Sequence, residues 1–252
     1  FIIMGSILSS PEDISLDETT YRILSYNVEW GFLDIPGDIN SDSCGHPIPN
    51  TKEAQQTHLT LISKNIGIVN PDICFLQEMG SLDAVKFLSN QLKKLFNLDY
   101  DVCYSNGDEK GQQGVGLLVR TTISHKCSIV NIPNFRLNRA LGLTLQEGSR
   151  TYKIVGVHLK SLYDGKIEKD EEEQSQQIQS VLDWIDESDD AIVCGDFNNV
   201  PGSSPIKKMT DAGYEGILSS EKYIPNITGN TFTEFHGKNG KESGSRIDYI
   251  FK

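Results

Sequence analysis

Several short apolar runs in this sequence carry, at or near their ends, a polar residue of a type that binds metals or moves protons. In the clearest run, AIVCGDFNN, apolar and small residues lead to Gly195, and Asp196 and Asn198 then stand two positions apart. Because side chains alternate along a strand with a period of two, we expect these two side chains to leave the same face of one strand. An aspartate and an asparagine placed in this way could supply a base and a hydrogen-bond donor to one reacting group.

Four other runs have the same character: ILSYN (23–27), ICFLQE (73–78), IVGVH (154–158) and IDYI (247–250). Carboxylate and amide oxygens suit hard divalent cations such as Mg²⁺. A histidine close to an aspartate suits proton transfer. Together these residue types predict a metal-assisted hydrolase.

The bulk properties of the chain bound this prediction. Its 252 residues are enough for one large α/β domain, expected over 21–252 after a solvated lead-in over 1–20. No apolar run approaches the roughly 20 residues of a membrane-spanning helix. We expect the protein to be a monomer. The net charge of -12 argues against tight non-specific binding of polyanions. A phosphate substrate stays compatible, because a bound divalent cation inverts the local charge.

Both ends of the chain have the character of cut ends. The opening FIIMGSIL is too short and uncharged for a complete signal peptide, although it could be the end of one. If translation starts at Met4, MGSILS fits the pattern for myristoylation of Gly5. The last run, SRIDYIFK, stops at Lys252 without a capping turn, so we expect one or more strands to be missing after it.

The spacing of apolar residues predicts helices over 51–69, 81–96, 168–187 and 206–212. Strands are expected near 21–28, 73–77, 100–104, 114–120, 127–132, 140–146, 151–159, 231–235 and 246–251. The near-continuous apolar runs indicate strands that are buried on both sides. Because helical segments fall between several of them, the pattern favours two sheets packed face to face with helices outside.

Two further features receive a structural interpretation. The acidic run EKDEEE (168–173) is expected to be a solvated helix start, where negative charge is favourable, and not a metal site. The five cysteines form no CxxC motif, so a zinc site is not predicted. Cys74 and Cys194 lie inside apolar runs and are expected to be small buried side chains.

Six motifs cover the chain from the first expected strand to its last residues. They are SYNVEW (25–30), PDICFLQE (71–78), GVGLLVR (114–120), VHLKS (157–161), GDFNNVPGS (195–203) and RIDYIF (246–251). In this order they resemble the endonuclease/exonuclease/phosphatase superfamily, which has the fold of deoxyribonuclease I and exonuclease III. The resemblance implies an α/β class and a four-layer α/β/β/α sandwich of two mostly antiparallel sheets with outer helices, here without its last strand or strands.

The resemblance also implies roles for individual residues. Glu78 is implied to be the main carboxylate ligand of a catalytic Mg²⁺, with Mn²⁺ as an alternative, and Asn27 to complete or support this metal site. Asp196 is implied to position or deprotonate the attacking water, and Asn198 to hold the phosphate. His158 is implied to contact the scissile phosphate or to donate a proton. Asn199 is expected to point the other way and to form a turn.

Asp248 raises a question about activity. The aspartate of the RIDY motif is implied to hydrogen-bond a catalytic histidine in a later Ser-Asp-His motif, and this sequence contains no such tripeptide. The chain could be a piece of an active enzyme, or a pseudoenzyme, or another histidine could substitute, with His236 nearest in sequence. Because loss of a general acid or base typically costs about 10²–10⁴ in rate, we expect this chain to be inactive or very slow.

The function that these observations predict is a metal-dependent phosphoesterase acting on a phosphodiester rather than a monoester. Nucleic acid, sphingolipid and inositol phosphate all stay open as substrates, and the sequence lacks the basic clusters that would favour nucleic acid. The loop Gly31–Asn50 is the best candidate for substrate selection. The alternative is a catalytically inactive binding domain of the same fold.

Overall fold

The computed structural model describes residues 2–6, 20–34, 48–106, 113–132, 139–162, 167–186, 188, 190–216, 234–238, 241–245 and 248–252. For 2–6, Ile167, 234–238, 241–245 and Asp248 this covers the backbone alone. The chain divides into two compact units, Ile2–Ile123 and Ser124–Lys252. Each unit contains one five-stranded mixed sheet.

The sheet of unit Ile2–Ile123 has the strand order β1-β2-β3-β5-β4. Its strands are β1 (Ile2–Ser6), β2 (Arg22–Gly31), β3 (Ile73–Met79), β4 (Tyr100–Tyr104) and β5 (Gly114–Arg120). β2 and β3 are parallel, and the other pairs of this sheet are antiparallel. Because parallel neighbours run in one direction, the ends of β2 and β3 lie at the same edge of the sheet.

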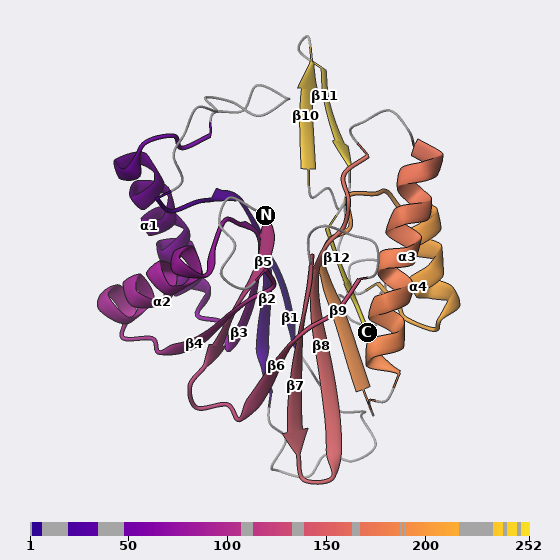
Figure 1. Ribbon diagram of the computed structural model, residues 1–252, viewed down its shortest axis with the longest axis horizontal. Helices are drawn as coiled ribbons and strands as arrows, with labels where there is room; N and C mark the ends of the chain where they lie inside the picture. The colour runs from indigo at the N-terminus through magenta and orange to yellow at the C-terminus, as the bar shows by residue number, and fades with distance from the viewer. Residues whose placement is uncertain are drawn as a thin grey trace. The chain divides into compact units, whose positions relative to one another are not determined.

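Two helices, α1 (Lys52–Val69) and α2 (Leu82–Phe96), pack on this sheet (Figure 1). Each begins at a hydroxyl cap, because Thr51 Oγ1 accepts from Ala54 N and Ser81 Oγ accepts from Ala84 N, both at 3.1 Å. Each ends at an asparagine in the left-handed region. Their apolar faces share one core with alternate strand residues: Leu59, Ile62, Ile66, Leu88 and Leu92 with Leu24, Cys74, Leu76 and Leu118.

The sheet of unit Ser124–Lys252 has the strand order β12-β9-β8-β7-β6. Its strands are β6 (His125–Ile129), β7 (Ala140–Glu147), β8 (Arg150–His158), β9 (Asp190–Asp196) and β12 (Asp248–Phe251). β8 and β9 are parallel and end at one edge, where the antiparallel β12 begins. A separate two-stranded sheet joins β10 (Glu234–Lys238) to β11 (Lys241–Ser245).

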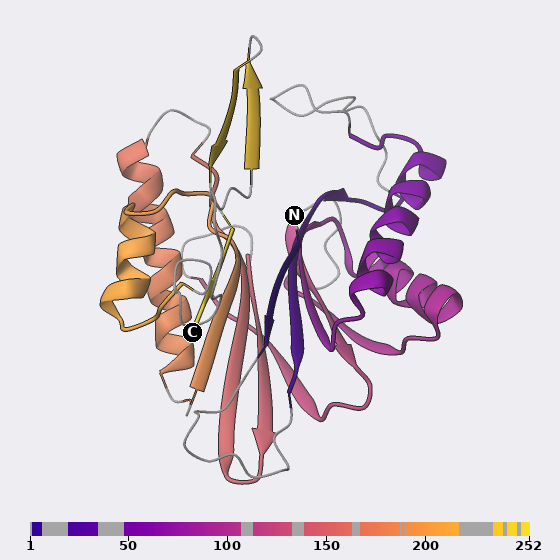
Figure 2. The same cartoon turned by 180° about the vertical axis from the view of Figure 1, so that it is seen from behind.

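Helices α3 (Ile167–Ile185) and α4 (Ser204–Asp211) lie side by side in this unit, as Figure 2 shows from behind. Their apolar residues form a second core with one face of β8 and β9. It contains Ile178, Val181, Ile185, Ile206 and Met209 together with Val155, Val157, Val193 and Phe197. The residues that alternate with the strand positions of this core, including His158 and Asp196, therefore lie on the opposite face of the sheet.

The predicted α/β fold class, with two mostly antiparallel sheets and flanking helices, is confirmed. All four helices and most strands lie within a few residues of their expected positions. β1 was not predicted, and it lies in the stretch expected to be a lead-in. β6 lies at 125–129 instead of 127–132. The apolar Val130 and Ile132 suggested a longer strand, but they are buried in the second core without continuing it.

Cys74 and Cys194 are fully buried, as expected from their apolar runs. Within the part of the chain that the structure describes, no helix is long and apolar enough to cross a membrane.

Candidate functional site

Glu78 stands at the end of β3, where the strand is irregular. The register between β3 and β5 shifts between Leu76 and Met79, and Glu78 has a φ of 62°. The neighbouring β2 is irregular at the same edge, since its register with β3 shifts between Asn27 and Gly31. Such bulges re-aim side chains at the rims of sheets. Glu78 therefore leaves the strict alternation of its strand, and its carboxylate is half-buried.

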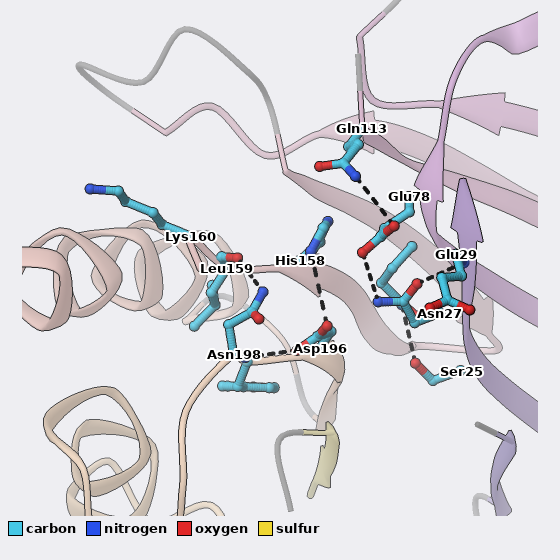
Figure 3. Close-up of polar contacts among 12 residues, drawn as sticks. Ser25, Asn27, Glu29, Glu78, Gln113, His158, Leu159, Lys160, Asp196 and Asn198 are labelled. Atoms are coloured by element: carbon cyan, nitrogen blue, oxygen red, sulfur yellow. Dashed lines mark hydrogen bonds and ion pairs between the residues drawn. The ribbon is translucent and has the colours of Figure 1, made fainter. Parts of the chain in front are cut away.

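Three N–H groups contact the Glu78 carboxylate, and Figure 3 shows those of Asn27 and Gln113. Asn27 Nδ2 donates to Oε1 at 3.2 Å, whereas the main-chain N–H of Trp30 and the side-chain amide of Gln113 both donate to Oε2 at 3.3 Å. These donors come from β2, from its bulge and from the residue before β5. They orient one carboxylate in a way that its strand alone could not.

Asn27 acts on Glu78 through its nitrogen. Its Oδ1 accepts from the main-chain N–H of Glu29 at 3.0 Å, which fixes the orientation of the amide and directs Nδ2 towards Glu78. Two roles were implied for Asn27: to complete a metal site as a ligand, or to support it. This hydrogen-bond pattern fits the second role, because Asn27 directs an N–H group at the carboxylate of Glu78. On the same face, the buried Gln77 donates to Ser25 Oγ at 3.1 Å.

His58 on α1 is a neighbour of this site that the sequence did not reveal. Its Nε2 lies 3.0 Å from the carbonyl of Val28 and 2.9 Å from that of Glu29. Because carbonyls only accept, Nε2 must carry the proton. His58 thus stabilises the left-handed turn at Glu29 and Trp30, whose φ values are 52° and 64°. Gln113 was also missed, since no periodicity marks a residue that lies just before a strand.

A second group of residues lies at the shared edge of β8, β9 and β12. His158 pairs in register with Asp196, and Asp196 pairs with Asp248 on the other side. Gly195 allows this close pairing, because its φ is 140° and a Cβ there would lie 2.0 Å from the Val157 carbonyl oxygen. The pairing places three of the predicted catalytic positions next to one another across three strands.

His158 is buried and neutral. Burial, and secondarily the positive charge of Arg139, lowers the pKa of His158 well below its usual value. Its Nε2 lies 4.0 Å from Asp196 Oδ2, so the two side chains face each other without forming a true ion pair. A neutral imidazole can accept a proton or share the one that it carries.

Asp196 and Asn198 do not lie on one strand face, which corrects the expectation from their spacing. β9 ends at Asp196, and Asn198 follows in a left-handed turn with a φ of 48°. The reason is local, because Asp196 Oδ1 accepts from the Asn198 main-chain N–H at 2.7 Å and closes the turn. Asn198 Nδ2 then donates to the Leu159 carbonyl at 2.9 Å. Figure 3 shows these two contacts beside His158.

The acidic start of α3 is less solvated than expected. Asp170 is fully buried and bonded to Lys160 Nζ, which also contacts Glu173 at 2.8 Å. Hydrogen bonds to Asp170 and Glu173 raise the pKa of Lys160, and the bond to Lys160 lowers the pKa of Glu173. Asn199, expected to form a turn directed elsewhere, is also buried and donates to Gln174 at 2.8 Å. The partly exposed ammonium group of Lys160 therefore stabilises the Asp170 and Glu173 carboxylates at this helix start.

Some expected site features lie outside the described residues. The backbone of Asp248 is placed, but its side chain and that of His236 are not described. Residues 35–47 of the loop proposed for substrate selection and Arg246 lie wholly outside the described residues. Among the described residues, no three His, Cys, Asp or Glu side chains form a group that could hold a metal ion.

The sequence matches the model of the Endonuclease/Exonuclease/phosphatase family over residues 24–251. The chain therefore belongs to this family. The family includes hydrolases that act on phosphoesters, and its enzymes typically use divalent metals. Membership indicates a hydrolase of the phosphodiesterase or nuclease type.

Solved structures share the fold at low sequence identity. An endonuclease/exonuclease/phosphatase from Bacteroides vulgatus has a TM-score of 0.64 at 17% identity, with 93% of this chain and 87% of that chain covered. D. rerio TDP2 complexed with single strand DNA product has a TM-score of 0.59 at 20% identity, covering 91% and 82%. The human Nocturnin catalytic domain with bound sulfate has a TM-score of 0.55 at 16% identity, covering 92% and 82%. A comparison with curated protein sequences found no match.

Proposed function

We propose that this protein is a Mg²⁺-dependent phosphoesterase that hydrolyses a phosphodiester by metal-assisted attack of water. The observation that carries the proposal is the half-buried Glu78 carboxylate, which three N–H groups orient at the edge of a sheet. These hydrogen bonds hold the carboxylate in one orientation, and a metal ligand must be held in this way.

The residues of this edge fit a magnesium ion. Mg²⁺ is usually held by one or two carboxylates, with waters and substrate phosphate oxygens as its remaining ligands. Glu78 would be the carboxylate ligand, and Asn27 and Gln113 would orient it through their N–H groups. Mn²⁺ accepts the same oxygen ligands and is the alternative. When bound, the ion would neutralise charge on the phosphate and polarise it for attack.

The residues at the shared edge of β8, β9 and β12 would supply the other catalytic roles. Asp196 would position or deprotonate the attacking water, and the buried neutral His158 would contact the phosphate through its N–H. The Asn198 amide uses one hydrogen for the Leu159 carbonyl, and its second hydrogen would serve the phosphate. Asp248 would hydrogen-bond and orient a histidine.

Nucleic acid is one candidate substrate. One structure that shares the fold is TDP2 in complex with a single strand DNA product. The net charge of -12 means that binding of a nucleic acid to this chain would depend strongly on the divalent ion. We expect the protein to act as a monomer.

The metal site can be tested with terbium, which takes the same hard oxygen ligands and is sensitised by tryptophan. Trp30 donates its main-chain N–H to Glu78, so its indole is close enough to report an ion bound there. We expect terbium luminescence that Mg²⁺ competes away. Glu78→Gln should weaken the affinity at least about tenfold, whereas Glu172→Gln, an exposed carboxylate on α3, should leave it unchanged. Equal affinity in all three proteins would refute the assignment of Glu78.

Hydrolysis is tested separately with single-stranded DNA and with bis(p-nitrophenyl) phosphate, each with and without Mg²⁺. We expect slow turnover that requires Mg²⁺ and falls at least about 100-fold in Glu78→Gln. The alternative is a binding domain of the same fold without turnover. It predicts DNA binding that requires Mg²⁺ and Glu78 while no product forms. A protein that neither binds nor hydrolyses these esters would contradict both functions.

A further inference from the structure

One face of α3 carries a row of buried polar side chains. Asp170, Gln174 and Gln177 are spaced by four and three residues, and all three are fully buried. They continue the line of the apolar residues with which the second half of the helix packs on the sheet. Uncharged polar side chains are seldom buried to this extent unless they have specific partners. We call these three residues the α3 polar face.

Gln174 uses both ends of its amide. Its Nε2 donates to the Lys160 carbonyl at 2.6 Å and lies 3.3 Å and 3.4 Å from the carbonyls of Phe197 and Asn198. Its Oε1 accepts from Asn199 Nδ2 at 2.8 Å. One side chain therefore connects the segment that follows β8 to the turn that follows β9.

Lys160 strengthens the same connection. Its main-chain N–H donates to Gln177 Oε1 at 3.0 Å, and its ammonium group is paired with Asp170 and Glu173. In Figure 3 the Lys160 side chain points away from His158. Although it lies two residues after a predicted catalytic histidine, Lys160 thus belongs to the contacts with α3.

The turn that receives these contacts is strained and functional in the proposed scheme. Asn198 is in the left-handed region, which non-glycine residues adopt at a cost. The Asp196 carboxylate closes the turn from one side through the Asn198 N–H. Gln174 contacts it from the other side, through the carbonyls of Phe197 and Asn198. Neither β9 nor the short loop after it could supply these second contacts.

We propose that Gln174 is a positioning residue, which holds the Asp196–Asn199 turn and the end of β8 in register with each other. Through these main-chain contacts it sets where the Asp196 and Asn198 side chains stand relative to His158. This inference rests on the proposed function for its catalytic consequence. Its structural part, the control of the turn by Gln174, can be tested without any activity.

The test compares Gln174→Met with Gln176→Met. Methionine has nearly the shape of glutamine without its hydrogen bonds, and Gln176 is exposed on the same helix. Amide hydrogen exchange is measured at Asn198, whose N–H donates within the turn, and at Leu143 in β7 as a distant reference. We expect Gln174→Met to lose about 10- to 100-fold protection at Asn198 alone. Gln176→Met should match the wild type at both amides.

Kinetics give the second measurement. In Gln174→Met we expect kcat for the Mg²⁺-dependent reaction to fall about 10- to 100-fold with little change in KM, because misplaced groups impair the reaction more than binding. If Gln174→Met does not fold, Asn199→Ala removes the hydrogen bond from Asn199 Nδ2 to Gln174 Oε1 and should also give a loss of protection at Asn198 but not at Leu143. Unchanged protection at Asn198, or an equal loss at Leu143, would overturn the inference. If the wild type shows no hydrolysis, the proposed function fails, and the exchange measurement still decides the role of Gln174.

Discussion

The buried, neutral His158 should make the protein less stable in mild acid. In the folded state its pKa is well below 6.5, because burial and the charge of Arg139 both oppose protonation. In the unfolded chain the same imidazole titrates near its ordinary value. Between these two pKa values the unfolded chain binds one more proton than the folded protein. The free energy of unfolding must therefore fall as the pH drops below about 6.5.

The size of the effect follows from this linkage. One proton taken up only by the unfolded state changes the free energy of unfolding by about 1.4 kcal/mol per pH unit. Integrated from about pH 7.5 to about pH 5.5, with an unfolded pKa near 6.5, the contribution of His158 is about 1.4 kcal/mol. The contribution vanishes above about pH 7.5, where both states are neutral.

Urea unfolding of the wild type and of His158→Gln at these two pH values measures this contribution. Glutamine cannot titrate, so the pH-dependent loss should be about 1.4 kcal/mol smaller in the variant, whatever its stability at neutral pH. The other histidines and carboxyl groups are present in both proteins and cancel in the comparison. An identical pH-dependent loss in the two proteins would refute a buried neutral His158.

Two further substitutions test the local geometry of the site. Gly195→Ala should cost more than about 4 kcal/mol or prevent folding, since its Cβ would lie 2.0 Å from the Val157 carbonyl oxygen. Gly148→Ala, also at positive φ but with nothing within 4 Å of the added carbon, should cost only about 1–2 kcal/mol in the same thermal unfolding assay, and equal costs would contradict this contact. His58→Leu removes the donor to two carbonyls at the end of β2 and should cost about 1–3 kcal/mol and weaken terbium binding. An unchanged affinity would show that the turn at Trp30 holds without His58.

Much of the fold could be predicted from local patterns. The spacing of Leu59, Ile62 and Ile66 marked α1, and the serine at position 81 marked the start of α2 as its cap. These signals are local, because helix periodicity and capping involve residues within one or two turns. β1 gave no such signal, since its place is defined by pairing with β2 some twenty residues later.

The local geometry of the proposed site residues could be predicted only in part. Asp196 and Asn198 were proposed from their type and spacing as neighbours on one strand face, but a side-chain hydrogen bond ends β9 between them and places Asn198 in a turn. Gln113 and His58 were missed because each contacts the Glu78 edge only after distant segments come together. No periodicity within their own segments marks such residues.

By itself the sequence determined the family of the protein, because six motifs in one order carry the resemblance, and it supplied the residues that we propose for the chemistry. It also determined the main helices, because their apolar periods and caps are local. The tertiary structure alone decided how the chemical groups are held. The bulges that turn Glu78 towards Asn27, the burial that keeps His158 neutral, and the contacts of Gln174 with the turn at Asn198 all join residues far apart in the chain. They depend on strand register and burial, which no single segment contains.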